Sequence, residues 1–327
     1  MNNPFGIFSA HEISDAINLI PNTVGYLNSI NLFPVAPLYS SVAIVEISDG
    51  VLNVLPIQPR GGPSSVANVN ARRAKGFPVP QIPHDDHVSP DDVDGLRRFG
   101  TRNREALMSL LSDRLATARA KHDTTLEYMR FGALKGLILD HEGSTLYDLY
   151  SEFGVTQKTI NYQLNVATTN VIKHSLDAVR HIESTLAGDR KTGVEALVSP
   201  GFFDALVGHE KVQKAYANWQ EAQNRIGGDM RSGFTYGGIT YREVADQIGG
   251  MPLIEDGKGH IYPVGTTSTF RTYVAPGDFN DAIGAPGQIY YARVEPSKHQ
   301  RGYDIHTQSN PLPMCLRPGV LIEISAS

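Results

Sequence analysis

The densest group of chemically capable side chains in this sequence is the tetrad His84-Asp85-Asp86-His87. Imidazole and carboxylate groups are common ligands of divalent metal ions, so the tetrad is a candidate metal site. Consecutive residues of an extended segment point to alternate sides, however, and four ligands in a row rarely converge on one ion. Because Pro83 and Pro90 flank the tetrad, we predict a solvated acidic loop there.

Other candidate catalytic groups have simpler explanations in turns and loops. Ser199 precedes Pro200-Gly201 and lacks the Gly-x-Ser-x-Gly pattern of a nucleophile elbow. Asp256, Asp278 and Asp281 lie in segments whose Gly and Asp content favours turns. The glycine patterns of phosphate-binding and dinucleotide-binding loops do not occur in the sequence. We therefore predict no catalytic residue, no metal and no cofactor, in a protein that is not an enzyme.

The composition is that of an ordinary globular protein. Of 327 residues, 41% are hydrophobic and 19% are charged, and the net charge is −5. This length predicts about two compact units. The acidic balance argues against a dedicated nucleic-acid-binding protein, and apolar runs such as residues 42–45 are too short to cross a bilayer.

The two ends of the chain carry further signals. Residues 1–5 lack the basic region and the apolar core that are typical of a signal peptide. The single cysteine, Cys315, lies in an apolar segment and is predicted to be a buried thiol. A reducing, intracellular compartment fits this cysteine usage.

An extended arm is predicted for the first 40 residues, because Pro21, Pro34 and Pro37 limit regular structure there. Ser14 could cap a short helix that ends at Ile20. Apolar residues are scattered through this segment, so the arm needs a surface to lie against. That surface is either the rest of the chain or a neighbouring copy.

A β-ribbon is predicted next. Residues 42–47, the turn Asp49-Gly50 and the return segment 51–57 have the pattern of a hairpin. Residues 58–95 are rich in proline and glycine, which is typical of functional arms and linkers. The arginine-rich stretch 60–104 is equally compatible with a solvated surface and with a contact role.

Residues 102–134 form the longest predicted helix, because apolar residues recur there at steps of three and four. At about 1.5 Å per residue, this helix would span roughly 45–50 Å. The remaining positions are mostly charged or polar and include Arg119, Asp123, Glu127 and Arg130. A hairpin over 137–150, helices over 167–187 and 202–223, and scattered strands complete a predicted α+β fold. The strand candidates lie at 195–198, 234–236, 239–241, 251–254, 260–264, 271–274, 289–292 and 320–324.

Short segments follow one another along the chain in a specific order. They are Arg60-Gly61-Gly62, Ala133–Gly136, Asp140–Gly143, Val198–Phe203, Val212–Lys214, Tyr236–Ile239, Tyr273–Gly277 and Ser309–Met314. No single segment is long, and the resemblance rests on their order and spacing. From about residue 40 onward, the sequence resembles the major capsid proteins of tailed phages, and more closely the lambda-type major head protein family.

This resemblance implies an HK97-like capsid fold of the α+β class. Its expected parts are an N-terminal arm (1–39), a β-ribbon E-loop (40–90), a P domain with the spine helix (91–167), an A domain (168–300) and return strands to the P domain (301–327). It also implies a major capsid protein, whose copies self-assemble into hexamers and pentamers of the icosahedral head around the phage genome.

The resemblance implies partners and a location as well. The partners are other copies of the chain, together with scaffold, portal and decoration proteins, whereas DNA is enclosed without specific binding and no membrane is involved. The expected location is the virion, after assembly in the host cytoplasm. The candidate inter-subunit contact residues are Arg60, Gly61, Gly62, Arg72, Arg73 and Lys75.

Three other interpretations stay open. One is a metal-dependent intracellular hydrolase that uses His84 and His87. Another is a phage tail or decoration component that binds an existing shell. The third is the shell protein of a cellular nanocompartment with the same fold.

Overall fold

The chain folds into two compact units, each built from segments that are far apart in the sequence. The computed structural model describes residues 10–20, 25–47, 73–95, 103–140, 143–186, 188–215, 230–248 and 251–327. The first unit comprises Met1–Ile44, Gly76–Glu127 and Thr272–Pro313. The second comprises Val45–Lys75, Tyr128–Arg271 and Met314–Ser327.

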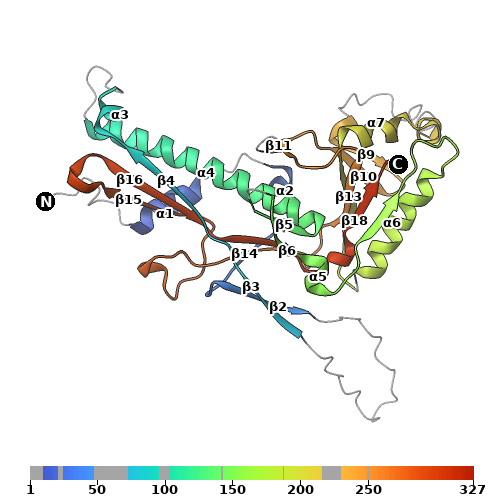
Figure 1. The fold of residues 1–327 in the computed structure, drawn as a ribbon, viewed down its shortest axis with the longest axis horizontal. Helices are drawn as coiled ribbons and strands as arrows, with labels where there is room; N and C mark the ends of the chain where they lie inside the picture. Colours follow the sequence, from blue (N-terminus) through green and yellow to red (C-terminus); the bar gives the residue numbers. More distant parts are fainter. Residues whose placement is uncertain are drawn as a thin grey trace, which may run out of the picture. The chain divides into compact units, whose positions relative to one another are not determined.

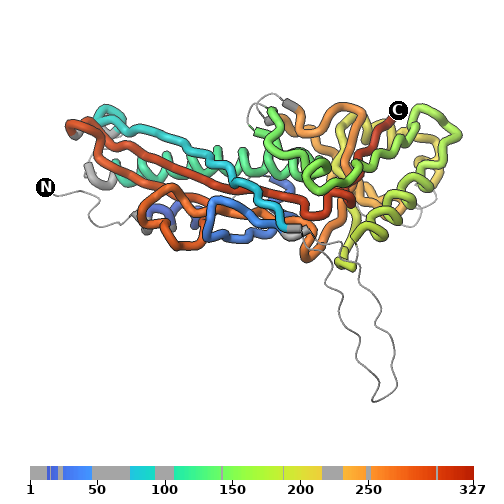
Figure 2. The backbone as a smooth tube through the Cα atoms, turned by 60° about the horizontal axis from the view of Figure 1, so that its bottom comes forward, coloured from blue at the N-terminus to red at the C-terminus, as the bar shows by residue number. Residues whose placement is uncertain are grey.

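A three-stranded antiparallel sheet in the order β15-β16-β4 forms the frame of the first unit (Figure 1). Val88, Leu111 and Ile305 form a hydrophobic core where this sheet meets the long helix α4. Its elements are β4 (Ile82–Val88), α4 (Asn103–Lys135), β15 (Tyr291–Pro296) and β16 (Tyr303–Ser309). Figure 2 follows β4 and β16 side by side along most of their length.

Helix α4 confirms the predicted helix of residues 102–134 to within one residue at each end. It ends where Gly136 adopts a positive φ of 81°, a conformation that glycine reaches without a steric penalty. Its sequence periodicity was a sound guide because a helix this long repeats its pattern over many turns.

The predicted arm contains more regular structure than its prolines suggest. Helix α1 (Ala10–Leu19) packs on β15, with Ile17 in one cluster with Tyr290 and Ala292. Ser14 lies inside this helix, so the prediction that it caps the helix is wrong. A short helix α2 (Tyr26–Ser29) follows, and the edge strand β1 (Val35–Pro37) pairs in parallel with β14 (Phe270–Val274).

A six-stranded mixed sheet in the order β7-β18-β13-β8-β10-β9 is the centre of the second unit. Its strands are β7 (Lys158–Asn161), β8 (Gly193–Val198), β9 (Phe234–Tyr236), β10 (Ile239–Glu243), β13 (Lys258–Val264) and β18 (Ile322–Ser325). A buried group of hydroxyls lies beside it, in which Tyr241 is 2.9 Å from both Tyr162 and Ser175. The sheet confirms the strand candidates at 195–198, 234–236, 239–241 and 260–264.

Helices α6 (Val171–Thr185) and α7 (Pro200–Gly208) belong to the same unit (Figure 1). The sequence predicted one helix over 202–223, but α7 ends at Gly208, His209 is extended, and residues 210–215 are helical again. The His209 ring lies 3.1 Å from the carbonyl oxygen of Val166 at this break. Residues 216–223 lie outside the described residues. Helix α6 confirms the helix predicted over 167–187, although its apolar residue Ile172 is 43% exposed.

Smaller elements complete the described chain. They are the hairpin of β5 (Leu137–Leu139) and β6 (Thr145–Asp148), helices α3 (Pro90–Gly95) and α5 (Leu149–Phe153), strands β11 (Gln247–Ile248), β12 (Met251–Pro252) and β17 (Pro311–Cys315), and 3-10 turns at Met230–Ser232, Asn280–Ala282, Lys298–Gln300 and Pro318–Val320. Cys315 is buried as predicted, and burial raises the pKa of its thiol to about 12. Within the described residues, no helix has the length and apolar character that crossing a membrane requires.

Candidate assembly surface

The β-ribbon of the structure consists of β2 (Val42–Ile47) and β3 (Arg73–Pro78). Of the predicted contact residues, Arg73 and Lys75 lie in β3, while Arg60, Gly61, Gly62 and Arg72 lie outside the described residues. The predicted return strand at 51–57 also lies outside them. The ammonium group of Lys75 forms an ion pair with the carboxylate of Glu152, so this residue already has a partner within its own chain.

Strand β2 has apolar side chains on both of its faces. Ala43 and Val45 are buried, whereas Val42 is 36% and Ile44 is 69% exposed. A two-stranded ribbon has little stability by itself in water. The outer face of β2 is therefore apolar, and covering it with another surface would lower the free energy of the protein.

The His-Asp tetrad lies in β4, so the predicted loop is wrong. Its residues pair with β16 in the register His84↔Thr307, Asp85↔His306, Asp86↔Ile305 and His87↔Asp304. Pro83 lies within the paired segment, opposite Gln308, and Pro90 lies beyond its end, so neither proline prevents the ladder.

The tetrad divides between the two faces of β4, as the alternation of an extended strand predicts. On one face, the His84 ring is 3.1 Å from the Lys121 ammonium group, and Asp86 is 3.5 Å from the Arg114 guanidinium. On the other face, His87 pairs with Asp304 at 2.7 Å, and Asp85 contacts His306. Among the residues that the structure describes, no group of three or more His, Cys, Asp or Glu side chains is placed to hold a metal ion.

A buried polar network joins α1 to α4. Arg119 donates a hydrogen bond to the Asp123 carboxylate at 2.9 Å and another to the backbone carbonyl of Ile17 at 2.7 Å. The Tyr290 hydroxyl donates to the second oxygen of Asp123, and its ring centroid lies 3.9 Å from the Arg119 guanidinium carbon. This network holds the arm helix against its own chain.

The sequence grouped Arg119, Asp123, Glu127 and Arg130 with the polar positions outside the apolar stripe, but all four are buried. The i, i+4 spacing of Arg119 and Asp123 was the available signal for an ion pair. Their burial was not predictable, because Tyr290 lies 167 positions from Asp123 in the sequence. Glu127 is likewise used inside the unit, since its carboxylate accepts a hydrogen bond from the Leu27 amide at 2.7 Å.

Two residues that had been candidates for catalysis stabilise local structure instead. Ser199 accepts a hydrogen bond from the Phe202 amide at 3.3 Å and thereby caps α7. Asp281 accepts two hydrogen bonds of 2.7 Å from the Arg293 guanidinium. The sequence placed Ser199 in a loop and Asp281 in a turn, and it predicted neither the cap nor the pair with Arg293.

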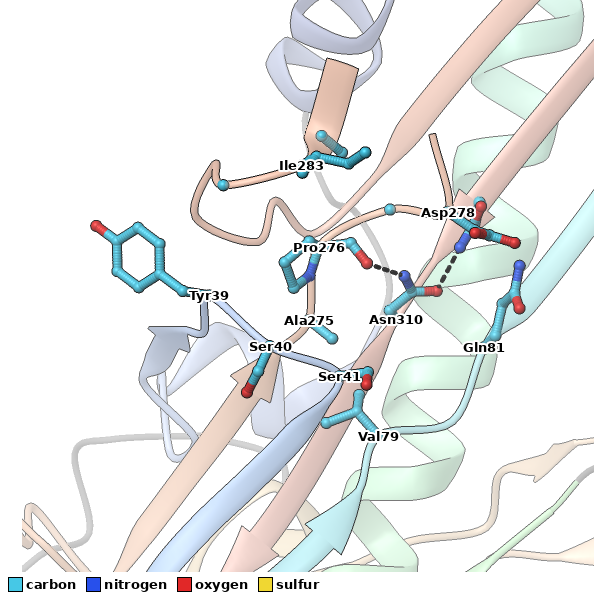
Figure 3. Close-up of a pocket in the computed structure, with 14 residues that line it drawn as sticks. Tyr39, Ser40, Ser41, Val79, Gln81, Ala275, Pro276, Asp278, Ile283 and Asn310 are labelled. Atoms are coloured by element: carbon cyan, nitrogen blue, oxygen red, sulfur yellow. Dashed lines mark hydrogen bonds between the residues drawn. The ribbon is translucent and has the colours of Figure 1, made fainter. Parts of the chain in front are cut away.

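A pocket of about 450 Å³ lies in the first unit at the root of the ribbon (Figure 3). Backbone hydrogen bonds tie its walls together, from Val79 to the Ser41 carbonyl at 2.9 Å and from Ala275 to the Asn310 carbonyl at 3.0 Å. Its lining residues are Tyr39, Ser40, Ser41, Val79, Gln81, Ala275, Pro276, Gly277, Asp278, Ala282, Ile283, Gly284, Gln308 and Asn310. They come from separate parts of the sequence with no shared motif, so sequence reasoning missed this site.

Two large side chains of this pocket, one aromatic and one aliphatic, are highly exposed to solvent. Tyr39 is 73% exposed and Ile283 is 81% exposed. Together with Val42 and Ile44 of β2, they place apolar groups around the ribbon root. We call the pocket lining and these two β2 residues the root surface.

Comparison with known proteins places the chain among phage shell components. Residues 9–326 match the family described as phage major capsid protein E. The major capsid protein of Salmonella phage Felix O1 is 26% identical, with 98% of this chain and 96% of that protein covered. The major capsid protein of Pseudomonas phage KPP10 is also 26% identical, with 98% and 97% covered.

Solved structures show a shared fold at low sequence identity. A prophage capsid protein from Escherichia coli CFT073 superimposes with a TM-score of 0.58 and 11% identity, covering 98% of this chain and 99% of that one. The capsid asymmetric unit of cyanophage A-1(L) gives a TM-score of 0.50 and 11% identity, covering 94% of each chain.

Proposed function

Because this chain belongs to the phage major capsid protein E family, we propose that its copies assemble into hexamers and pentamers and close as the icosahedral head. The protein is a phage major capsid protein with an HK97-like α+β fold, as the sequence predicted. The observation that carries the proposal is the family match over residues 9–326. The exposed apolar face of β2 supports it, because this face needs a covering surface.

The proposal extends to partners and place. The proposed shell encloses the genome without binding it specifically, which agrees with a chain of net charge −5. Scaffold, portal and decoration proteins are further proposed partners, and assembly in the host cytoplasm is the proposed route to the virion. Membership of the lambda-type group, and a ribbon that acts as the E-loop through Arg60, Gly61, Gly62, Arg72, Arg73 and Lys75, are also part of the proposal.

A metal-dependent hydrolase is a weaker candidate. His84 and His87 pair with Thr307 and Asp304 on β16 and lie on opposite faces of β4. Two ligands that point to opposite faces of one strand cannot share an ion. We therefore propose a structural role without a catalytic step.

Negative-stain electron microscopy of the purified chain tests the proposed function. We expect uniform hollow particles or rings of capsomer size, because closed symmetric assembly multiplies many small contacts. Analytical ultracentrifugation of the same sample measures the assembled fraction. A chain that remains a monodisperse monomer at high concentration, with and without added scaffold protein, contradicts the proposal.

A further inference from the structure

The pocket of the root surface contains a hydrogen-bond acceptor without a donor. The Asn310 amide nitrogen donates to the Pro276 carbonyl at 2.8 Å (Figure 3), and the Asn310 oxygen accepts from the Gln308 amide nitrogen at 2.9 Å. A carbonyl can only accept, so this chain of bonds fixes the orientation of both amides. The remaining oxygen, Gln308 Oε1, has no donor among the described residues.

This unpaired acceptor marks a weak point of the pocket wall. Gln308 is 1% exposed, and a buried acceptor without a partner costs about 1–3 kcal/mol. Its oxygen is closed to solvent, so an N–H donor of an occupant reaches it only when the surrounding packing opens.

The charge of the pocket favours a cationic occupant. Asp278 is the one charged side chain among the lining residues, and it is exposed. No Lys or Arg of the described residues forms an ion pair with it. A cation that approaches Asp278 therefore meets a carboxylate with no competing partner in the described part of its own chain.

The mouth of the pocket suits a long basic side chain. Tyr39 offers an aromatic face, which attracts cations, and Ile283 offers apolar contact for an aliphatic stem. At the centre of an interface, aromatic residues such as Tyr39 often dominate the binding free energy.

We propose that this pocket binds a Lys or Arg side chain that a second copy of the chain presents. The inference rests on the proposed function, because each copy in a shell is surrounded by other copies. The chain has 29 Lys and Arg residues to offer. Continuity also favours a second copy, since Ser40 and Ser41 line the pocket and lead directly into the exposed apolar face of β2.

Photo-crosslinking tests the identity of the occupant. Tyr39→p-benzoylphenylalanine places a photoreactive aromatic group at the mouth, and particles are assembled from an equal mixture of 14N-labelled and 15N-labelled chains. We expect crosslinked peptides that carry one light and one heavy label and contain Lys or Arg near the attachment point. Crosslinks of a single label type only, no crosslink, or a different protein at this position would overturn the inference.

A charge reversal tests the role of the carboxylate. Asp278→Lys should lower the assembled fraction at least tenfold at equal protein concentration, because it repels the proposed cation. Asp204→Lys, at an exposed position of α7, is the matched control and should assemble like the wild type. Equal assembly of all three chains contradicts the inference alone. A wild-type chain that forms no particles contradicts the proposed function, and this inference with it.

Discussion

Arg119 of α4 is joined to Ile17 of α1 by a hydrogen bond of 2.7 Å, across 102 positions of sequence. The same guanidinium binds Asp123, so one buried cation serves a carboxylate and a backbone carbonyl together. The apolar Ile17 side chain packs on Tyr290 and Ala292 in the same region. Within the first unit, the arm helix is therefore a structural part of the subunit.

Replacing Arg119 tests this network. Arg119→Leu should lower the free energy of unfolding by about 3–5 kcal/mol, because it leaves the Asp123 carboxylate buried without its cation. Arg180→Leu is the control, since Arg180 is 68% exposed and pairs with Asp177 on the surface of α6. Its loss should be below about 1 kcal/mol. Urea unfolding measures both values, and equal losses would mean that the buried pair has no special role.

Gly25 tests the contact between the arm and Glu127. It has a φ of 92°, and an added Cβ would overlap the Glu127 carboxylate, which is bonded to the Leu27 amide. Gly25→Ala should therefore cost about 3 kcal/mol, from backbone strain and from displacement of the carboxylate. Gly154→Ala, at φ 66° and ψ 35° in the left-handed helical region with nothing within 4 Å of the new Cβ, should cost about 1 kcal/mol. Thermal unfolding compares the two variants. Equal costs would mean that neither the backbone conformation of Gly25 nor the contact with Glu127 adds to the cost.

Elements with long local patterns were the predictable part of the fold. Helix α4 carries its own periodicity, and strands β8, β10 and β13 lie in the short strand candidates that the sequence predicted. Strand β4 was missed because its polar residues alternate without an apolar face, and only pairing with β16 makes it a strand. Tertiary context of this kind has no local signal.

The candidate site was less predictable than the fold. The first ribbon strand at 42–47 was predicted, but its partner β3 (Arg73–Pro78) was not. The contact role stays a prediction, and four of the six named contact residues lie outside the described part of the chain. The pocket depends on Gln308 and Asn310 meeting Pro276, which are brought together only by the folded backbone. A buried unpaired oxygen is a property of the assembled packing, so no pattern of residue types announces it.

Two buried histidines predict how stability depends on pH. Burial lowers the pKa of His122 to about 4 and that of His260 to about 3, below the value near 6.5 of an unfolded chain. The folded state therefore keeps both rings neutral, while the unfolded state binds protons more readily as the pH falls below about 6.5. The contribution of these two rings to the free energy of unfolding should therefore be fully present above pH 6.5. It should decline as the pH falls toward 4.

The variant His122→Gln keeps a polar group near the Thr307 hydroxyl, which lies 3.0 Å from the ring. Between pH 7 and pH 4, the free energy of unfolding should fall by about 2–3 kcal/mol less in this variant than in the wild type. Urea unfolding at pH 7, 5.5 and 4 measures this difference. A variant whose pH profile overlays that of the wild type would show that His122 does not govern the decline.

The basic residues near the ribbon are the proposed contacts with neighbouring copies. Reversing two of them, in the double variant Arg60→Glu and Arg72→Glu, should block shell formation and leave the monomer folded, because acidic surfaces of the neighbour would repel it. Electron microscopy and circular dichroism measure the two outcomes. Arg180→Glu on α6 is the control and should still assemble. Normal shells from the double variant would contradict the proposed contact role.

Strand β18 (Ile322–Ser325) lies between β7 and β13 in the six-stranded sheet, although more than 50 residues separate it from either strand along the chain. Without β18, β7 would lose its neighbour in this sheet, and β13 would become an edge strand with unpaired backbone groups. The order of strands in the second unit therefore depends on a segment that is distant in sequence.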